Sequence, residues 1–210
     1  MLSTFPAGFH WTHRLTVQFG IAKLDCIMAQ LLIRKFEPKD QKQAAELYNV
    51  GKDTYSDLPI YRDMLKYRFH ERLSPGGDMY DIEAAYMSDD GKSCFWVAEV
   101  ENKIVGIIGA IPSTKFDPLT HVELVRMSVD STVRRMGVGS RLIRVLEDWG
   151  KDNGYHSVNL YTLGAMKLAR SLYEKNDYSL VETEKKDVSE LLQLPESAVI
   201  ELVHYVKRLV

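Results

Sequence analysis

The chain has 210 residues, of which 45% are hydrophobic and 27% charged, with a formal net charge of −2. This length fits one domain with a sizeable core, and the composition is ordinary for a soluble globular protein. The balance of charge gives no reason to expect nucleic acid or an anionic membrane as a partner, and two cysteines exclude a disulfide framework.

The first 29 residues differ from the rest, because Met1 to Leu24 contains no Asp or Glu. Two interpretations remain: a mitochondrial presequence, since such segments avoid acidic residues, or an extension that packs loosely on the domain. We favour the second. We therefore divide the chain into an N-terminal extension over residues 1–29 and one folded domain over residues 30–210, which we expect in the cytoplasm, with a mitochondrial location as the alternative.

The first half of the domain alternates helical and extended patterns. The expected elements are a strand at 31–34, helices from Pro38, at 61–72 and at 80–87, and a hairpin of strands at 94–98 and 104–111. The apolar run from Ile104 to Pro112 is too short to span a membrane. The histidines are scattered without supporting metal ligands, so we expect no metal.

The second half continues in the same alternating way. The pattern of apolar residues predicts a strand at 122–129, a helix from 138 to about 154, a strand at 156–162 and a helix at 167–175. Closing strands are expected at 178–182 and 199–206, around a charged loop. The order of elements predicts a mixed α/β fold without internal repeats.

The turn between the strand at 122–129 and the following helix carries the strongest functional motif, Arg-Arg-Met-Gly-Val-Gly. Its two glycines let the backbone approach a ligand, and the free N–H groups of a helix N-terminus suit a phosphate. Arginines add planar, charged donors. We therefore predict a pyrophosphate site formed by Arg134, Arg135, Gly137, Val138, Gly139 and Ser140.

Other phosphate motifs do not fit. The chain contains no Walker loop, and Leu142 stands where a dinucleotide fingerprint needs its third glycine. The remaining pattern, Arg/Gln-x-x-Gly-x-Gly/Ala after a strand, resembles the coenzyme A signature of the Gcn5-related N-acetyltransferases (GNAT), over about residues 30–208. The resemblance implies acetyl-CoA as cosubstrate and a central sheet splayed between its fourth and fifth strands. The pantetheine arm would enter there and bond to the backbone of Met127 and Val129.

Two segments, 93–99 and 123–130, look like the camello-like branch of that superfamily, which includes enzymes that acetylate the amine of aspartate or of cysteine S-conjugates. Members of this branch usually carry an apolar membrane hairpin after the first helix. Here residues 57–81 are rich in charge instead. The chain is therefore either a soluble offshoot of the branch, or similar to it only in the core.

Glu123 is the predicted general base, because a carboxylate beside an ammonium can take its proton, and the resemblance places the base eleven positions before Arg134. The alternative is that Glu123 faces solvent or pairs with Arg126. Alternation along a strand puts Glu123 on one face with Met127 and Val129, unless a bulge interrupts it.

Tyr173 is the predicted acid, because the resemblance places it where a tyrosine protonates the departing thiolate. It lies in an Ala-x-x-Leu-Tyr-Glu segment that is similar to a helix of the superfamily, although Met166 and Tyr178 depart from the usual pattern there. The alternative is an aromatic ring that packs in the core.

The expected reaction is direct attack by the amine of a small molecule on acetyl-CoA. The alternatives are a protein or peptide acetyltransferase and a non-catalytic acyl-CoA sensor, and a homodimer is left open. We predict that the acceptor mouth is formed by the connections Gly51 to Tyr61 and Lys185 to Ser197. Further candidates for the acceptor pocket are Asp53, Tyr55, Asp57, Tyr61, His121 and Tyr161.

Overall fold

A computed structural model describes residues 30–51, 59–87 and 91–210. The predicted N-terminal extension and the candidates Asp53, Tyr55 and Asp57 lie outside the described residues. In chain order the elements are β1 (Leu32–Lys35), η1 (Pro38–Asp40), α2 (Gln41–Val50), α3 (Pro59–Leu73), α4 (Ile82–Tyr86), β2 (Cys94–Val100), β3 (Lys103–Pro112), β4 (His121–Val129), η3 (Ser131–Val133), α5 (Val138–Asp152), β5 (Ser157–Leu163), α6 (Lys167–Lys175), β6 (Ser179–Asp187) and β7 (Val199–Arg208).

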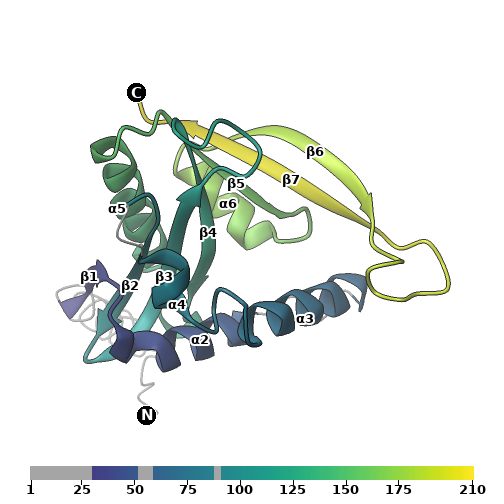
Figure 1. The fold of residues 1–210 in the computed structure, drawn as a ribbon, viewed down its shortest axis with the longest axis horizontal. Helices are drawn as coiled ribbons and strands as arrows, with labels where there is room; N and C mark the ends of the chain where they lie inside the picture. The colour runs from purple at the N-terminus through teal and green to yellow at the C-terminus, as the bar shows by residue number, and fades with distance from the viewer. Residues whose placement is uncertain (1–29, 52–58, 88–90) are drawn as a thin grey trace, which may run out of the picture.

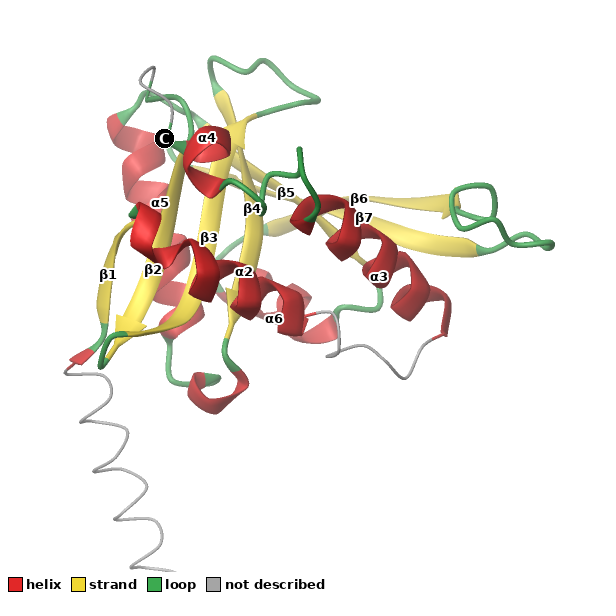
Figure 2. Ribbon diagram, turned by 60° about the horizontal axis from the view of Figure 1, so that its bottom comes forward, coloured by secondary structure: helices red, strands yellow, loops and turns green. Residues whose placement is uncertain are grey.

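The strands form one seven-stranded sheet in the order β1-β2-β3-β4-β5-β7-β6 (Figure 1). Neighbouring strands are antiparallel except β4 and β5, which are parallel. Helices cover both faces (Figure 2): α2, α3 and α4 enclose one buried cluster, and α5 and α6 enclose the other. The predicted mixed α/β fold is confirmed.

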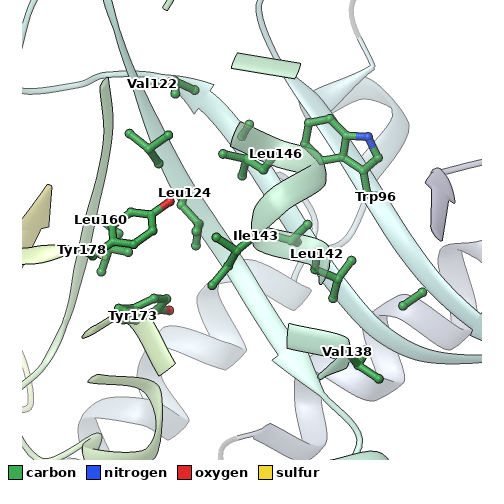
Figure 3. Packing of buried hydrophobic residues seen from close by; sticks show 14 of the residues in the cluster. Trp96, Val122, Leu124, Val138, Leu142, Ile143, Leu146, Leu160, Tyr173 and Tyr178 are labelled. Atoms are coloured by element: carbon green, nitrogen blue, oxygen red, sulfur yellow. The ribbon is translucent and has the colours of Figure 1, made fainter. Parts of the chain in front are cut away.

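Helix α5 packs on the sheet through one apolar stripe, as the 3.6-residue period of its sequence requires (Figure 3). Leu142, Ile143 and Leu146 on this stripe are each at most 1% exposed. The helix comes close to β3 because Gly106 has no side chain: a β-carbon there would lie 2.9 Å from Cδ1 of Leu142. This packing fixes where the N-terminus of α5 meets the end of β4.

Strand β4 contains a bulge. Ile107 and Gly109 of β3 pair with Ser128 and Val125, so that three steps along β4 match two along β3. Arg126 in the bulge adopts φ +55°. Val125 therefore packs in the cluster under α2 and α3, while Met127 and Val129 pack in the cluster under α5.

The bulge corrects one expectation from the sequence. Simple alternation places Glu123 on one strand face with Met127 and Val129, but the extra residue moves the latter two to the other face of the sheet.

Strands β4 and β5 separate after a short parallel contact. Only His121 to Glu123 of β4 pair with Ser157 to Asn159 of β5, whereas β5 continues along β7 as far as Leu163. The predicted splay between the fourth and fifth strands is confirmed. We call the gap between the diverging strands the wedge, and its closed end at Glu123 and Asn159 the apex.

Strand β6 is longer than the sequence predicts, because it pairs with β7 from Ser179 to Asp187. Lys185 and Lys186 therefore belong to a strand rather than to the predicted loop. Helix α3 starts near this hairpin (Figure 1), where the hydroxyl of Tyr61 accepts a hydrogen bond of 3.3 Å from the backbone N–H of Glu201 on β7. Helix α3 thus contacts the hairpin at its N-terminal end.

Candidate active site

The predicted phosphate site lies at the N-terminus of α5. Gly137 is its N-cap residue, with φ +83° and ψ 0°, a conformation that suits glycine. The first helical bond runs from Arg141 N–H to Gly137 C=O at 3.0 Å, so the amides of residues 138–140 point out of the helix end. A β-carbon on Gly137 would meet nothing within 4 Å. This glycine is therefore required by the backbone conformation, and the space beside its α-carbon is open.

The second glycine of the motif has a different role. A β-carbon on Gly139 would lie 2.9 Å from Cδ2 of Leu172 and 3.2 Å from Cε of Met127, so Gly139 lets α5 approach α6 and β4. Val138 is 1% exposed and offers only its backbone to a ligand. The hydroxyl of Ser140 accepts a 3.0 Å hydrogen bond from Asn176.

Two exposed arginines, Arg134 and Arg135, flank the helix N-terminus. Nε of Arg134 donates a 3.3 Å hydrogen bond to the carbonyl oxygen of Val129 at the end of β4. The structure thus brings the phosphate motif and the strand predicted to hold the pantetheine arm into direct contact.

Glu123 lies at the apex and is 7% exposed. Its Oε1 accepts hydrogen bonds from the backbone N–H of Thr114 at 2.8 Å, the hydroxyl of Thr114 at 2.8 Å and the hydroxyl of Ser113 at 3.3 Å. Both alternatives are wrong: Glu123 does not face solvent, and Arg126 bonds to Asp78 at 2.6 Å instead. One carboxylate oxygen of Glu123 therefore anchors the loop between β3 and β4.

A buried histidine beside Glu123 was not predicted from the sequence. His204 on β7 is 5% exposed, and its Nε2 lies 3.1 Å from Oδ1 of Asn159 at the apex. Since an amide oxygen can only accept, Nε2 carries the proton. Burial lowers the pKa of His204, so the ring is neutral at pH 7. The sequence does not reveal this contact, because His204 and Asn159 are 45 positions apart.

Two of the candidates for the acceptor pocket, Tyr161 and His121, lie in the group of rings around His204. The ring of Tyr161 stacks on His204 at 4.5 Å between centroids, and Nζ of Lys115 lies 4.2 Å from the centre of the Tyr161 ring. His121 stacks on Phe116 at 5.5 Å, and Phe116 in turn stacks on His204 at 5.5 Å. The apex is thus lined by aromatic rings on the acceptor face.

Tyr173 approaches from the opposite face of the sheet. It is 7% exposed and packs with Tyr178 at a centroid distance of 6.0 Å (Figure 3). Its ring also lies 6.1 Å from that of Tyr205. The ring does pack in the core, as the alternative held, yet it belongs to the cluster that borders the wedge. Glu123 and Tyr173 therefore stand on the two faces of the sheet.

The sequence of this chain matches the acetyltransferase (GNAT) family over residues 59–178. The chain belongs to this family, in agreement with the fold and with the helix N-terminus at the end of β4.

Individual relatives support the resemblance to the camello-like branch. The probable N-acetyltransferase camello of Xenopus tropicalis is 39% identical over 98 residues, which are 47% of this chain and 43% of that protein. N-acetyltransferase 8 of Homo sapiens is 41% identical over 100 residues, 46% of this chain and 43% of that protein. N-acetylaspartate synthetase of Danio rerio is 44% identical over 108 residues, 51% of this chain and 37% of that protein. The chain thus matches less than half the length of each relative.

Solved structures share the fold at low identity. An N-acetyltransferase from Staphylococcus aureus Mu50 superposes with a TM-score of 0.65 at 15% identity, covering 86% of this chain and 99% of that one. Within residues 30–51, 59–87 and 91–210, no three His, Cys, Asp or Glu side chains are grouped as a metal site. The described helices also include none that is long and apolar enough to cross a membrane.

Proposed function

We propose that this protein transfers the acetyl group of acetyl-CoA to the primary amine of a small molecule by direct attack. The observation that carries this proposal is the separation of β4 from β5 directly after Glu123, which opens a wedge along β4 towards the N-terminus of α5, whose first amides have no partner within the helix. A nucleotide pyrophosphate and an extended arm fit these two features in that order.

Each part of the cosubstrate has a matching element. The backbone of Gly137 to Ser140 would hold the pyrophosphate, with Arg134 and Arg135 adding charge. The pantetheine arm would lie along β4 and bond to the backbone of Met127 and Val129, in the stretch that β5 leaves unpaired. This stretch has the edge groups of a strand, which bind an extended amide chain well.

The two proton transfers are assigned to residues on opposite faces of the sheet. The amine nitrogen forms a bond to the thioester carbon and loses a proton towards Glu123, and the C–S bond breaks as the thiolate takes a proton from Tyr173. Since Oε1 of Glu123 is held by Ser113 and Thr114, Oε2 is the oxygen assigned to the amine.

The test is a coenzyme A release assay with acetyl-CoA and a panel of small primary amines, run beside a panel of peptides with free N-termini. Turnover with small amines supports the proposal, and turnover with peptides alone favours a protein acetyltransferase. Tight binding of acetyl-CoA without turnover on either panel would instead favour the acyl-CoA sensor.

A further inference from the structure

Arg126 has a strained backbone conformation inside a strand. Its φ of +55° lies in the left-handed region, which a residue with a β-carbon adopts only at a cost. Glycine would avoid this cost, so an arginine at this position indicates that its side chain is used. The other non-glycine residues with positive φ in the described ranges lie in turns: Glu101, Asn102, Arg135, Asp177 and Gln193.

The side chain of Arg126 is held by two residues from the segment between α3 and β2. Nε of Arg126 donates a 2.6 Å hydrogen bond to Oδ2 of Asp78, and the hydroxyl of Tyr86 donates another to the same oxygen. Burial and the charge of Asp78 raise the pKa of the Tyr86 phenol, which therefore keeps its proton and stays a donor. We call Asp78, Tyr86 and Arg126 the bulge clamp.

The segment that carries Asp78 is itself fixed. A β-carbon on Gly77 would lie 2.3 Å from the carbonyl oxygen of Arg72, so only glycine lets the turn after α3 pack this closely. The backbone N–H of Met79 donates a 3.0 Å bond to the same carbonyl oxygen. The side chain of Gln41 on α2 donates a 2.9 Å bond to the carbonyl oxygen of Met79. Asp78 therefore presents its carboxylate from a segment that two helices hold in place.

Tyr86 packs against the strand opposite the bulge. Helix α4, which carries it, lies against β2 and β3 (Figure 2). The ring is 1% exposed, and a β-carbon on Gly109 would lie 3.1 Å from its Cε1. Gly109 pairs with Val125, the residue before Arg126. The clamp thus connects β3 to the bulge in β4 through side chains, in addition to the backbone pairing of the two strands.

The bulge determines which way the next residues of β4 face. With the extra residue, Met127 and Val129 pack under α5, in the stretch that β5 leaves unpaired. A bulge that relaxed to regular pairing would shift the register by one residue and turn both side chains to the other face. Since the backbone of these residues is assigned to the pantetheine arm, binding of the arm requires that the bulge persists.

We propose that Asp78 and Tyr86 are positioning residues for the cosubstrate, because through Arg126 they hold the β4 bulge in its strained conformation. Tyr86 belongs to the cluster under α2 and α3, on the face opposite to the phosphate site, so its effect is indirect. A charge-assisted hydrogen bond offsets the cost of the positive φ, and its loss lowers the fraction of molecules that have the bulge. This inference rests on the proposed function, since it assigns the bulge to the binding of acetyl-CoA.

The first experiment measures the affinity for coenzyme A by titration calorimetry. Asp78→Asn removes the charge at nearly constant shape, and we expect Kd to rise about tenfold, the effect of one hydrogen bond to a charged group. Tyr86→Phe leaves the ion pair in place and should raise Kd about threefold.

Asp40→Asn is the matched control for the loss of a partly buried ion pair. Asp40 also accepts a 2.6 Å bond from an arginine, Arg34 on β1, and β2 and β3 lie between β1 and β4. This variant should lose stability and keep the wild-type Kd. Wild-type affinity in Asp78→Asn, or equal effects of Asp78→Asn and Asp40→Asn, would overturn the proposal.

Two double variants distinguish the clamp from a general loss of stability. Asp78→Asn with Arg126→Ala removes both charges and keeps the β-carbon, whereas Asp78→Asn with Arg126→Gly also relieves the positive φ. We expect a Kd about tenfold above wild type for the alanine variant and within about threefold of wild type for the glycine variant. Equal Kd values for the two double variants would show that the clamp does not act through the bulge.

Hydrogen exchange without coenzyme A separates failure of the clamp from failure of the proposed function. The amides of residues 127–129 should exchange about tenfold faster in Asp78→Asn, because the bulge opens more often, and at the wild-type rate in Asp40→Asn. Unchanged exchange in Asp78→Asn would refute the clamp, whatever the protein binds. Faster exchange, together with a wild-type protein that binds no coenzyme A, would instead refute the proposed function and the role given to the bulge.

Discussion

Replacing Gly137 by valine tests the phosphate site most directly. At φ +83° a residue with a β-carbon pays roughly 1–2 kcal/mol, and a β-branched residue is at the upper end. A β-carbon at this position would have no atom within 4 Å, so no clash adds to this cost. We expect a loss of about 2 kcal/mol, which lowers Tm by roughly 4–8 °C for a domain of this size.

Gly137→Val should also weaken the binding of coenzyme A, beyond its effect on the free energy of unfolding. The valine side chain would occupy the open space beside the helix N-cap, where the pyrophosphate is expected. Losing one hydrogen bond to a charged group costs about 1.5–3 kcal/mol, which corresponds to a Kd raised roughly 10- to 100-fold. Titration calorimetry with coenzyme A, performed below the lowered Tm, measures this change on folded protein.

Gly154→Val is the matched control at the other end of α5. Gly154 has φ +80°, and a β-carbon there would also meet nothing within 4 Å. It should lose similar stability and keep its affinity for coenzyme A. Unchanged affinity in folded Gly137→Val, or an equal loss in Gly154→Val, would refute the assignment of the pyrophosphate to this helix end.

Three further outcomes follow from the structure. Glu123→Gln should lower kcat most at low pH, where less amine is free, and a pH–rate profile parallel to that of the wild type would contradict its role as base. Tyr173→Phe should lower kcat while the calorimetric affinity for coenzyme A stays nearly constant; wild-type kcat would remove it from the mechanism. Burial raises the pKa of Asp130, but its bonds to Lys103 and to Thr132 outweigh this and lower the value to about 2, below the ordinary 3.8. Its contribution to stability should therefore be complete above about pH 4 and be lost as the pH falls towards 2. Urea unfolding of Asp130→Asn should show a weaker pH dependence in that interval, and an unchanged one would disprove the linkage.

The sequence by itself determined most helices and strands, the order of the elements and the position of the phosphate motif. Those features are local: the apolar stripe of α5 repeats with the helical period, and Gly137 marks a positive φ at the start of that helix. The end of β6 was not predictable in this way, because every side chain from Ser179 to Asp187 is exposed. No alternation of buried and exposed residues marks such a strand, and only pairing with β7 sets its length.

The tertiary structure decided how the site is assembled. The bulge at Arg126 depends on the register with β3, and it alone determines that Arg126 and Met127 serve opposite faces of the sheet. The bond between Asn159 and His204 joins residues 45 positions apart. The bond between Arg126 and Asp78 likewise joins residues 48 positions apart. Such contacts arise from packing between distant segments, and no periodicity within either segment encodes them.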